Sequence, residues 1–337
     1  MTLHARHVRT RTAVQAAPAV LLLAGLALAG CSSTASAPSP SDSAGGAVAA
    51  AYPVTVSSCG HDFTYDKAPS RVVLGNYRTL KTLDALGVAD SVTGVILGPD
   101  DRGEPPADLP AGVEVVSPDA IPAREPVIAA EPDLFLSFNE AQLVGQGTLS
   151  YDDLTGAGAN AYVMGGYCAE PTGEQSIDTV YADIADLGKI YDAPAQAERL
   201  DEELRDRVAA AKASLNGATP TVAFLKVVGG KVYAIGGYPA SAFVDALGLE
   251  NEFADLPTAF AELNTEQALA MTPDIVFVNY VGDEQAAIDE LAAALPDLTA
   301  VKDGRVYGAD ENLAQGSGVG IVDAIEAVAA EVEAAEQ

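Results

Sequence analysis

The pattern of apolar and polar positions predicts one long helix in the middle of the chain. Apolar residues recur there at spacings of three and four, on one helical face: Leu200, Leu204, Val208, Ala211 and Leu215. The positions between them are mainly charged residues and alanine. Asp192 is expected to cap the start, and Asn216-Gly217 is expected to end the helix. About 23 helical residues would span roughly 35 Å, the length of a small domain.

The sequence on one side of this helix is repeated on the other side. Asp-Ala-Leu-Gly occurs at 84–87 and again at 245–248. Farther along each half, a glutamate (Glu125 or Glu266) stands seven residues before a Pro-Asp pair, and an apolar run follows. Two such matches in the same order predict two similar lobes, one on each side of the helix.

Alternating short apolar runs and helical patterns predict an α/β sheet in each lobe. In the first half we expect strands at 54–57, 62–65, 72–75, 92–97, 113–116, 134–138 and 161–164, and helices at 79–86, 124–130, 151–157 and 176–191. In the second half we expect a hairpin of strands 221–228 and 231–235, further strands at 275–279 and 305–308, and helices at 240–247, 266–271, 284–293 and 318–335. The expected organisation is a lobe at 52–191, a linking helix at 192–216 and a lobe at 217–337.

The N-terminus has the composition of an export signal. Residues 1–30 combine a basic start with an apolar run that ends in Leu-Ala-Gly before Cys31. This resembles a bacterial lipoprotein signal, in which Cys31 becomes the acylated first residue and anchors the protein to the membrane. Residues 31–51 are rich in Ser, Ala, Gly and Pro, and we expect them to form a flexible tether.

Two further cysteines, Cys59 and Cys168, would lie in an oxidising compartment after export. A disulfide is the favoured prediction, and two separate buried thiols are the alternative. Such a bridge would close a loop of about 110 residues, for a nominal stabilisation of roughly 4–5 kcal/mol in the chain-entropy model.

Charge and missing motifs exclude several function classes. The net charge is −30, and the part after the arginine-bearing residues 1–30 carries −33, so nucleic acid is not an expected partner. The sequence has no Gly-x-Ser-x-Gly elbow, P-loop or dinucleotide fingerprint. His61 is the one histidine beyond residue 30, too few for a zinc or manganese site. We therefore expect no enzyme activity, no protein-bound metal and no cofactor.

Taken together, the motifs resemble the iron-siderophore and cobalamin binding proteins of ABC importers. The motifs that carry the resemblance are the lipoprotein signal, Pro69 to Val73, Leu86-Gly87, and the two Glu…Pro-Asp segments that begin at Glu125 and Glu266. The resemblance covers about residues 52–335. It implies a monomer of two Rossmann-like lobes joined by one long helix, with the ligand in the cleft between the lobes.

The resemblance also implies a partner. In this family one glutamate on each lobe pairs with arginines of a dimeric membrane permease, and Glu125 and Glu266 hold the matching positions. The alternative is that both are solvated first-turn residues favoured by the helix dipole. One departure concerns the ligand, because Asn76-Tyr77-Arg78 stands where this family often has a glutamate.

Ligands of open α/β sheets bind beyond the carboxyl ends of the strands. Polar and aromatic residues at those ends are therefore the candidate ligand-binding residues: Tyr77, Arg78, Asn139, Tyr162, Lys226, Tyr238, Asn279 and Tyr280. Tyrosine suits a large chelate with a mixed polar and apolar rim. The bases Arg78 and Lys226 would suit an anionic ferric catecholate, and a neutral or cationic hydroxamate chelate is equally open.

These observations predict an extracytoplasmic lipoprotein that captures a ferric siderophore and delivers it to an ABC permease. Cobalamin or haem is the alternative ligand. A lipid-anchored enzyme or an adhesion module is the alternative from another class.

Overall fold

A computed structural model describes residues 52–98, 109–145, 147–165, 167–169, 176–254, 256, 260–315 and 317–336. The expected signal at 1–30, the anchor Cys31 and the tether at 31–51 lie outside these residues. Within the described residues, no helix combines the length and the apolar character needed to span a membrane.

The first lobe is built on a five-stranded, fully parallel sheet with the strand order β5-β4-β3-β6-β7. Its strands are β3 (Val72–Leu74), β4 (Val92–Ile96), β5 (Glu114–Ser117), β6 (Leu134–Ser137) and β7 (Asn160–Val163). Its helices are η1 (Tyr77–Thr79), α1 (Leu80–Ala85), η2 (Ala89–Ser91), α2 (Arg124–Ala129), α3 (Ala141–Val144), α4 (Tyr151–Gly156) and α5 (Asp178–Ile190). Every residue of β3 and β6 is buried, as expected for continuous apolar runs at the centre of a parallel sheet.

A separate hairpin, β1 (Val54–Ser58) and β2 (His61–Tyr65), opens the described chain. Its two-residue turn is Cys59-Gly60, and both residues have positive φ, at 48° and 79°. This turn carries one cysteine of the disulfide described below.

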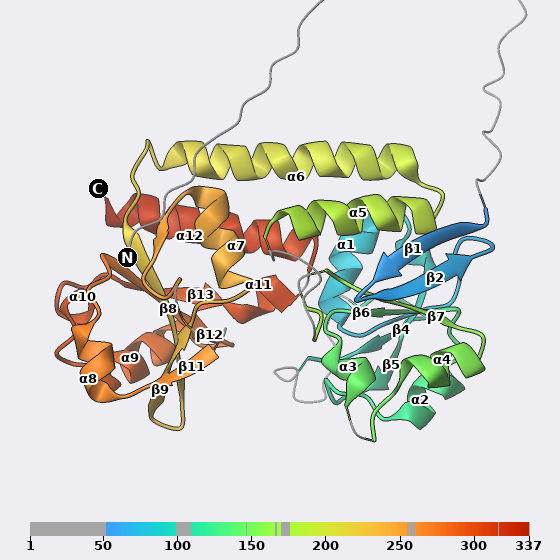
Figure 1. The fold of residues 1–337 in the computed structure, drawn as a ribbon, viewed down its shortest axis with the longest axis horizontal. Coiled ribbons are helices and arrows are strands. Elements are labelled where there is room, and N and C mark those ends of the chain that lie inside the picture. The colour runs from blue at the N-terminus through green and yellow to red at the C-terminus, as the bar shows by residue number, and fades with distance from the viewer. Residues whose placement is uncertain are drawn as a thin grey trace, which may run out of the picture. The chain divides into compact units, whose positions relative to one another are not determined.

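The long helix α6 (Pro194–Ser214) lies alongside α5 and α12 (Val319–Ala335), as Figure 1 shows. It buries the face expected from its periodicity, including Leu200, Leu204 and Val208. The expected cap by Asp192 is wrong. The residue before the helix is Ala193, which makes no side-chain cap, while Asp192 takes a left-handed conformation (φ 51°) in the tight turn between α5 and α6.

The second lobe has a mixed sheet with the order β11-β9-β8-β12-β13, and β10 pairs with β8. Its strands are β8 (Thr221–Val228), β9 (Lys231–Ile235), β10 (Glu250–Asn251), β11 (Phe260–Leu263), β12 (Ile275–Tyr280) and β13 (Val306–Asp310). Its helices are α7 (Ala240–Leu247), α8 (Thr265–Ala270), α9 (Glu284–Ala294), α10 (Thr299–Lys302), α11 (Glu311–Gln315) and α12. The Gly229-Gly230 turn makes β9 antiparallel to β8, so the two lobes are similar without being copies.

The repeated Pro-Asp pair has a structural role in each lobe. The carboxylate of Asp133 accepts hydrogen bonds from the backbone N–H groups of Ser70 and Arg71, just before β3. Asp274 accepts one in the same way from Thr221 N, at 2.9 Å, where β8 begins. In both lobes the aspartate therefore fixes the start of a central strand against its parallel neighbour.

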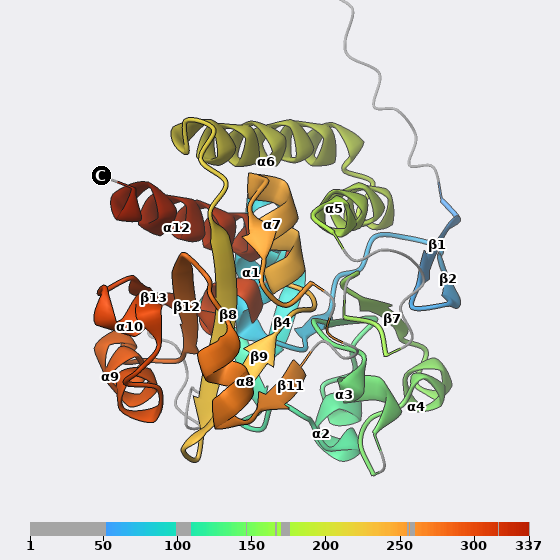
Figure 2. The ribbon, with the colours of Figure 1, turned by 60° about the vertical axis from the view of Figure 1, so that its left-hand side comes forward.

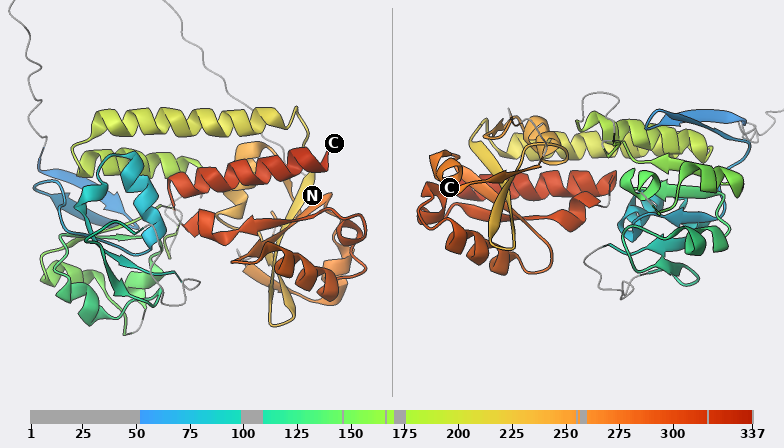
Figure 3. Two further views of the ribbon diagram at one scale, coloured as in Figure 1. Left: turned by 180° about the vertical axis from the view of Figure 1, so that it is seen from behind. Right: turned by 60° about the horizontal axis from the view of Figure 1, so that its bottom comes forward.

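Helix α12 belongs to the second lobe but contacts the first. Its first N–H, that of Val319, donates to Thr82 Oγ1 of α1 at 3.3 Å. The guanidinium of Arg207 on α6 binds Asp323 and Glu326 of α12, and Asp323 also pairs with Lys81 of α1. Figures 2 and 3 show α12 between α6 and the second-lobe sheet. One cluster of buried apolar side chains runs through both lobes and these helices.

Candidate functional site

The carboxyl ends of the second-lobe strands border a cavity of about 340 Å³, here called the second-lobe cavity. Polar residues from three strand ends line it: Lys226 of β8, Asn279 of β12, Asp310 of β13 and Glu311, which begins α11. The first lobe contributes Tyr167, from the segment after β7. Residues from both lobes thus meet where an open α/β sheet binds its ligand.

The positive charge in this cavity is paired. Lys226 Nζ lies 2.7 and 2.6 Å from the two carboxylate oxygens of Glu311, and both side chains are partly buried. Asp310 adds a second carboxylate and accepts a hydrogen bond from Asn312 N at 2.8 Å. Asn279 Oδ1 is buried and has no hydrogen-bond partner among the described residues. The polar part of the cavity therefore offers mainly acceptors.

The rest of the second-lobe cavity is apolar. Its wall includes Val228, Ile235, Phe243 and Phe260. Val228 is 48% exposed and Phe260 is 49% exposed, unusual values for large apolar side chains in a folded protein. Such a mixture of an apolar wall and a few polar groups suits an organic ligand or a chelate.

Tyr167 connects the lobes across this cavity. Its ring packs edge-on against Tyr238 of the second lobe, with centroids 5.0 Å apart, and against Phe138 at the end of β6. Burial raises the pKa of the Tyr238 hydroxyl. Burial likewise raises the pKa of Tyr167, so both side chains remain neutral phenols.

A second cavity of about 540 Å³, the inter-lobe cavity, lies between η1 and α1 on one side and α11 and α12 on the other. Tyr77 and Arg78 line it, and the Arg78 guanidinium lies 4.6 Å from the centroid of the Tyr77 ring. The opposite wall includes Asn312, whose Oδ1 is buried and has no partner among the described residues, and Asp323. The two cavities are lined by neighbouring residues of α11.

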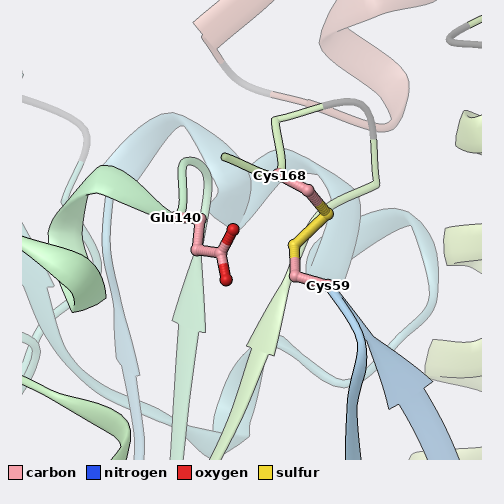
Figure 4. A group of neighbouring side chains, drawn as sticks. All are labelled: Cys59, Glu140 and Cys168. Atoms are coloured by element: carbon pink, nitrogen blue, oxygen red, sulfur yellow. A yellow bond between two sulfur atoms is a disulfide. The ribbon is translucent and has the colours of Figure 1, made fainter. Parts of the chain in front are cut away.

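A disulfide between Cys59 and Cys168 supports the segment that carries Tyr167 (Figure 4). The buried carboxylate of Glu140 lies beside it and accepts hydrogen bonds from Ala169 N at 2.6 Å and from the Tyr151 hydroxyl at 2.9 Å. The backbone N–H of Glu140 also donates to Tyr167 O at 3.0 Å. Cys59, Glu140 and Cys168 are close enough to hold a metal ion, but the two sulfurs are bonded to each other and offer no thiolate.

The structure changes the interpretation of three candidate residues. Tyr162 lies inside β7, is 3% exposed and donates to buried Asp183 at 2.8 Å, so it lines neither cavity. Tyr280 lines neither cavity, because its ring lies against Gly308 beside α9. Asn139 lines neither cavity, and its Oδ1 accepts from Ala141 N where α3 begins.

Four other candidates line the cavities: Tyr77 and Arg78 the inter-lobe cavity, and Lys226 and Asn279 the second-lobe cavity. Tyr238 lines neither, but its ring contacts Tyr167, which lines the second-lobe cavity. The sequence interpretation did not include Tyr167, Asp310 or Glu311. The strand-end rule would have found Asp310 and Glu311 had it been applied to β13, and Tyr167 is adjacent to a cysteine of the expected disulfide.

Glu125 and Glu266 lie in the first turns of α2 and α8, and both are exposed. In Figure 1 these two helices lie on the side of their lobes away from α6. Leu269 follows Glu266 by three residues on α8 and is 43% exposed, a large apolar side chain left to solvent. The exposed position of the two glutamates fits a docking surface, and neither residue lines either cavity.

Comparisons with known proteins agree with this architecture. Residues 72–313 match the family described as periplasmic binding protein. The chain is 25% identical over 325 residues to the uncharacterized ABC transporter substrate-binding lipoprotein YvrC of Bacillus subtilis, covering 92% of this chain and 94% of that protein. It is 28% identical over 264 residues to a cobalamin-binding protein of Halobacterium salinarum, covering 73% of this chain and 63% of that protein.

A solved structure supports the same conclusion. The ABC-type Fe3+-hydroxamate transport system protein from Saccharomonospora viridis matches with a TM-score of 0.69 and 26% identity, over 83% of this chain and 99% of that chain. The two-lobed α/β fold expected from the sequence is therefore confirmed. This chain belongs to the periplasmic binding protein family and is a substrate-binding protein of the ABC-importer type.

Proposed function

We propose that this protein captures a ferric siderophore outside the cytoplasm and delivers it to the permease of an ABC importer. The observation that carries the proposal is the second-lobe cavity, where polar strand ends, an apolar wall and Tyr167 of the opposite lobe surround one space. A ferric siderophore is an iron ion wrapped in organic groups, so it has both apolar and polar surface for such a lining.

The Fe3+-hydroxamate relative from Saccharomonospora viridis supports iron as the metal of the ligand, because the match with this chain covers 99% of that relative. The cobalamin-binding relative from Halobacterium salinarum supports cobalamin as the second candidate ligand. Both are large metal chelates, and neither candidate requires a bond to be made or broken. We propose no catalytic role and no resident cofactor for this chain.

Two further parts of the proposal concern location and delivery. The signal ahead of Cys31 supports a lipid anchor at the extracytoplasmic face of the cell membrane. The exposed carboxylates of Glu125 and Glu266, one on each lobe, support docking of a monomer on a permease dimer. Arginine pairs carboxylates with two parallel hydrogen bonds, so matched arginines on the permease would recognise their spacing.

The test is calorimetric titration of the full-length protein in detergent with ferrioxamine B, a ferric trihydroxamate, and with cyanocobalamin. We expect ferrioxamine B to bind with a Kd of about 1 μM or tighter. Tyr167→Ala should weaken this binding about tenfold, because the variant removes an aromatic wall of the cavity.

Tyr181→Ala is the matched control. Its ring lies on α5 beneath the Arg205 guanidinium, at 3.7 Å, and lines neither cavity. This variant should keep wild-type affinity. Binding of cyanocobalamin without ferrioxamine B would contradict the siderophore proposal, and equal losses in both variants would contradict the role of Tyr167.

A further inference from the structure

We propose that the cleft selects chelates without net negative charge, and that Glu311 is the residue that sets this selection. The inference rests on the proposed function, because it names the class of siderophore that the same site takes. Its physical basis is that Lys226, the lysine that lines the second-lobe cavity, already has a carboxylate partner within the protein.

The first step is the geometry of the pair. Lys226 projects from β8 and Glu311 from the first turn of α11, and their contact uses both carboxylate oxygens at 2.6 and 2.7 Å. Their side chains are 32% and 18% exposed, so water screens the pair only partly. An anionic ligand that approached Lys226 would also meet the charge of Glu311, and the attraction and repulsion would largely cancel.

The second step is the charge of the whole lining. Among the described residues, the two cavities are lined by the bases Arg78, Lys81 and Lys226 and by the acids Asp84, Asp310, Glu311 and Asp323. Acids outnumber bases, and Lys81 is also paired, with Asp323. The net charge of the chain is −30, which adds a repulsive field for any anion that approaches.

The third step is hydrogen bonding. Asn279, which lines the second-lobe cavity, and Asn312, which lines the inter-lobe cavity, each have a buried Oδ1 without a hydrogen-bond partner in the described part of the chain. A buried acceptor without a partner is costly, and a ligand that donates a hydrogen bond removes the cost. Amide N–H and ammonium groups are such donors, so a siderophore whose backbone carries them can satisfy these oxygens whichever groups bind its iron.

The pairing of Lys226 and the charge of the lining define the ligand class. Three hydroxamates neutralise a ferric ion, and an added ammonium group makes the chelate cationic. Three catecholates leave a trianion, which this lining repels. The exposed side chains of Val228 and Phe260 provide contact surface for the alkyl chains that link hydroxamate groups.

The experiment compares three chelates of similar size and different charge by calorimetric titration of the full-length protein. The probes are ferrioxamine B (cationic), ferrichrome (neutral) and ferric enterobactin (trianionic). For the wild type we expect the trianionic chelate to bind at least about a hundredfold more weakly than the other two.

The decisive variant is Glu311→Gln, which keeps the size and shape of the side chain and removes its charge, while one of the two oxygens that accept from Lys226 becomes an amide NH2 group. We expect it to strengthen ferric enterobactin binding about tenfold, to weaken ferrioxamine B binding several-fold and to leave ferrichrome nearly unchanged. Glu262→Gln is the matched control, because Glu262 pairs with Lys231 at 2.9 Å on the exposed β9–β11 edge and lines neither cavity. It changes the net charge equally and should alter none of the three affinities.

Each result decides the inference. The inference is supported if the affinities follow the charge of the chelate, and if Glu311→Gln shifts them while Glu262→Gln does not. Tight binding of ferric enterobactin to the wild type overturns the charge selection and leaves siderophore capture intact. An equal shift for all three chelates in Glu311→Gln overturns the role of Glu311. Failure to bind any chelate overturns this inference together with the proposed function.

Discussion

At the scale of single residues, Asp183 is a buried acid that contacts Gly165, just after β7. It is 3% exposed, and its carboxylate accepts from Gly165 N at 2.9 Å to each oxygen and from the Tyr162 hydroxyl at 2.8 Å. Burial raises the pKa of Asp183 to about 7, although these hydrogen bonds partly oppose the shift, and the neighbouring carboxylate of Asp186 raises it further.

The raised pKa predicts how stability depends on pH. Asp183 binds its proton in the folded state up to about pH 7, whereas in the unfolded chain it loses the proton near its ordinary pKa of 3.8. Because the folded state holds more protons in this window, the free energy of unfolding should fall as the pH rises from about 4 to about 7, by roughly 4 kcal/mol at most. Asp183→Asn should lack this contribution, since its amide stays neutral.

Urea unfolding of the wild type and of Asp183→Asn at pH 5 and at pH 8 measures the effect as a difference between the two proteins. The stability of the variant relative to the wild type should rise between the two pH values. Asp178→Asn removes an exposed carboxylate of the same helix and should show no such rise. A constant difference between wild type and Asp183→Asn would show that the buried carboxylate is ionised throughout.

At the scale of elements, the disulfide joins the β1–β2 turn to the segment after β7. Cys168 directly follows Tyr167, so the bridge fixes a wall of the second-lobe cavity to a hairpin that lies 109 residues earlier in the sequence. The hydrogen bond from Ala169 N to Glu140 holds the same segment from the other side. These contacts connect the redox state of the two cysteines to the shape of the cleft.

The double variant Cys59→Ser with Cys168→Ser should lower the free energy of unfolding, by at most about 4–5 kcal/mol in the chain-entropy model. It should also weaken ferrioxamine B binding, because Tyr167 loses one of its supports. Denaturant titration and calorimetry check the two effects.

Intact-mass analysis of the wild type tests the disulfide itself. After alkylation under denaturing conditions without reductant, neither cysteine should carry an added alkyl group; addition at both would contradict the bridge.

At the scale of the whole described molecule, the proposed function assigns ligand binding and permease docking to different residues. The candidate ligand residues line or border the two cavities, whereas Glu125 and Glu266 are exposed and line neither. Contacts of α12 with α1 and α6 tie the two lobes, so the two glutamates are carried on connected bodies.

The double variant Glu125→Ala with Glu266→Ala should retain stability and chelate affinity while slowing iron uptake, about tenfold or more, in cells or vesicles with the permease. Exposed carboxylates contribute only about 0–1 kcal/mol to folding, and the loss should therefore appear in transport alone. Arginine at both positions should be worse than alanine through like-charge repulsion.

The control for the transport measurement is Glu202→Ala with Glu203→Ala, which removes two exposed carboxylates from α6, on the other side of the described structure in Figure 1. It should transport like the wild type. Two results would contradict the docking assignment. One is uptake at the wild-type rate by the Glu125→Ala with Glu266→Ala variant, and the other is loss of chelate binding by the isolated variant protein.

Local sequence was sufficient for the longer elements and for the fold class. The spacing of Leu200, Leu204 and Val208 determined α6, because a helix brings residues three and four apart onto one face. Continuous apolar runs determined β3 and β6, and the Pro-Asp repeat indicated equivalent strands in two lobes. Short elements such as α3, α11 and β10 were missed, because one turn of helix or two strand residues leave too few positions for a period to show.

The candidate site was decided by tertiary structure, because its residues are distant in sequence. Lys226 and Glu311 are 85 residues apart, and no local pattern indicates that one neutralises the other. Tyr162 was placed at a strand end, yet the pairing of β7 with β6 and the packing of α5 turn its hydroxyl inward to Asp183. Periodicity reports which residues share a face of one element; only the packing of elements determines which charges meet, and so which ligand the cleft admits.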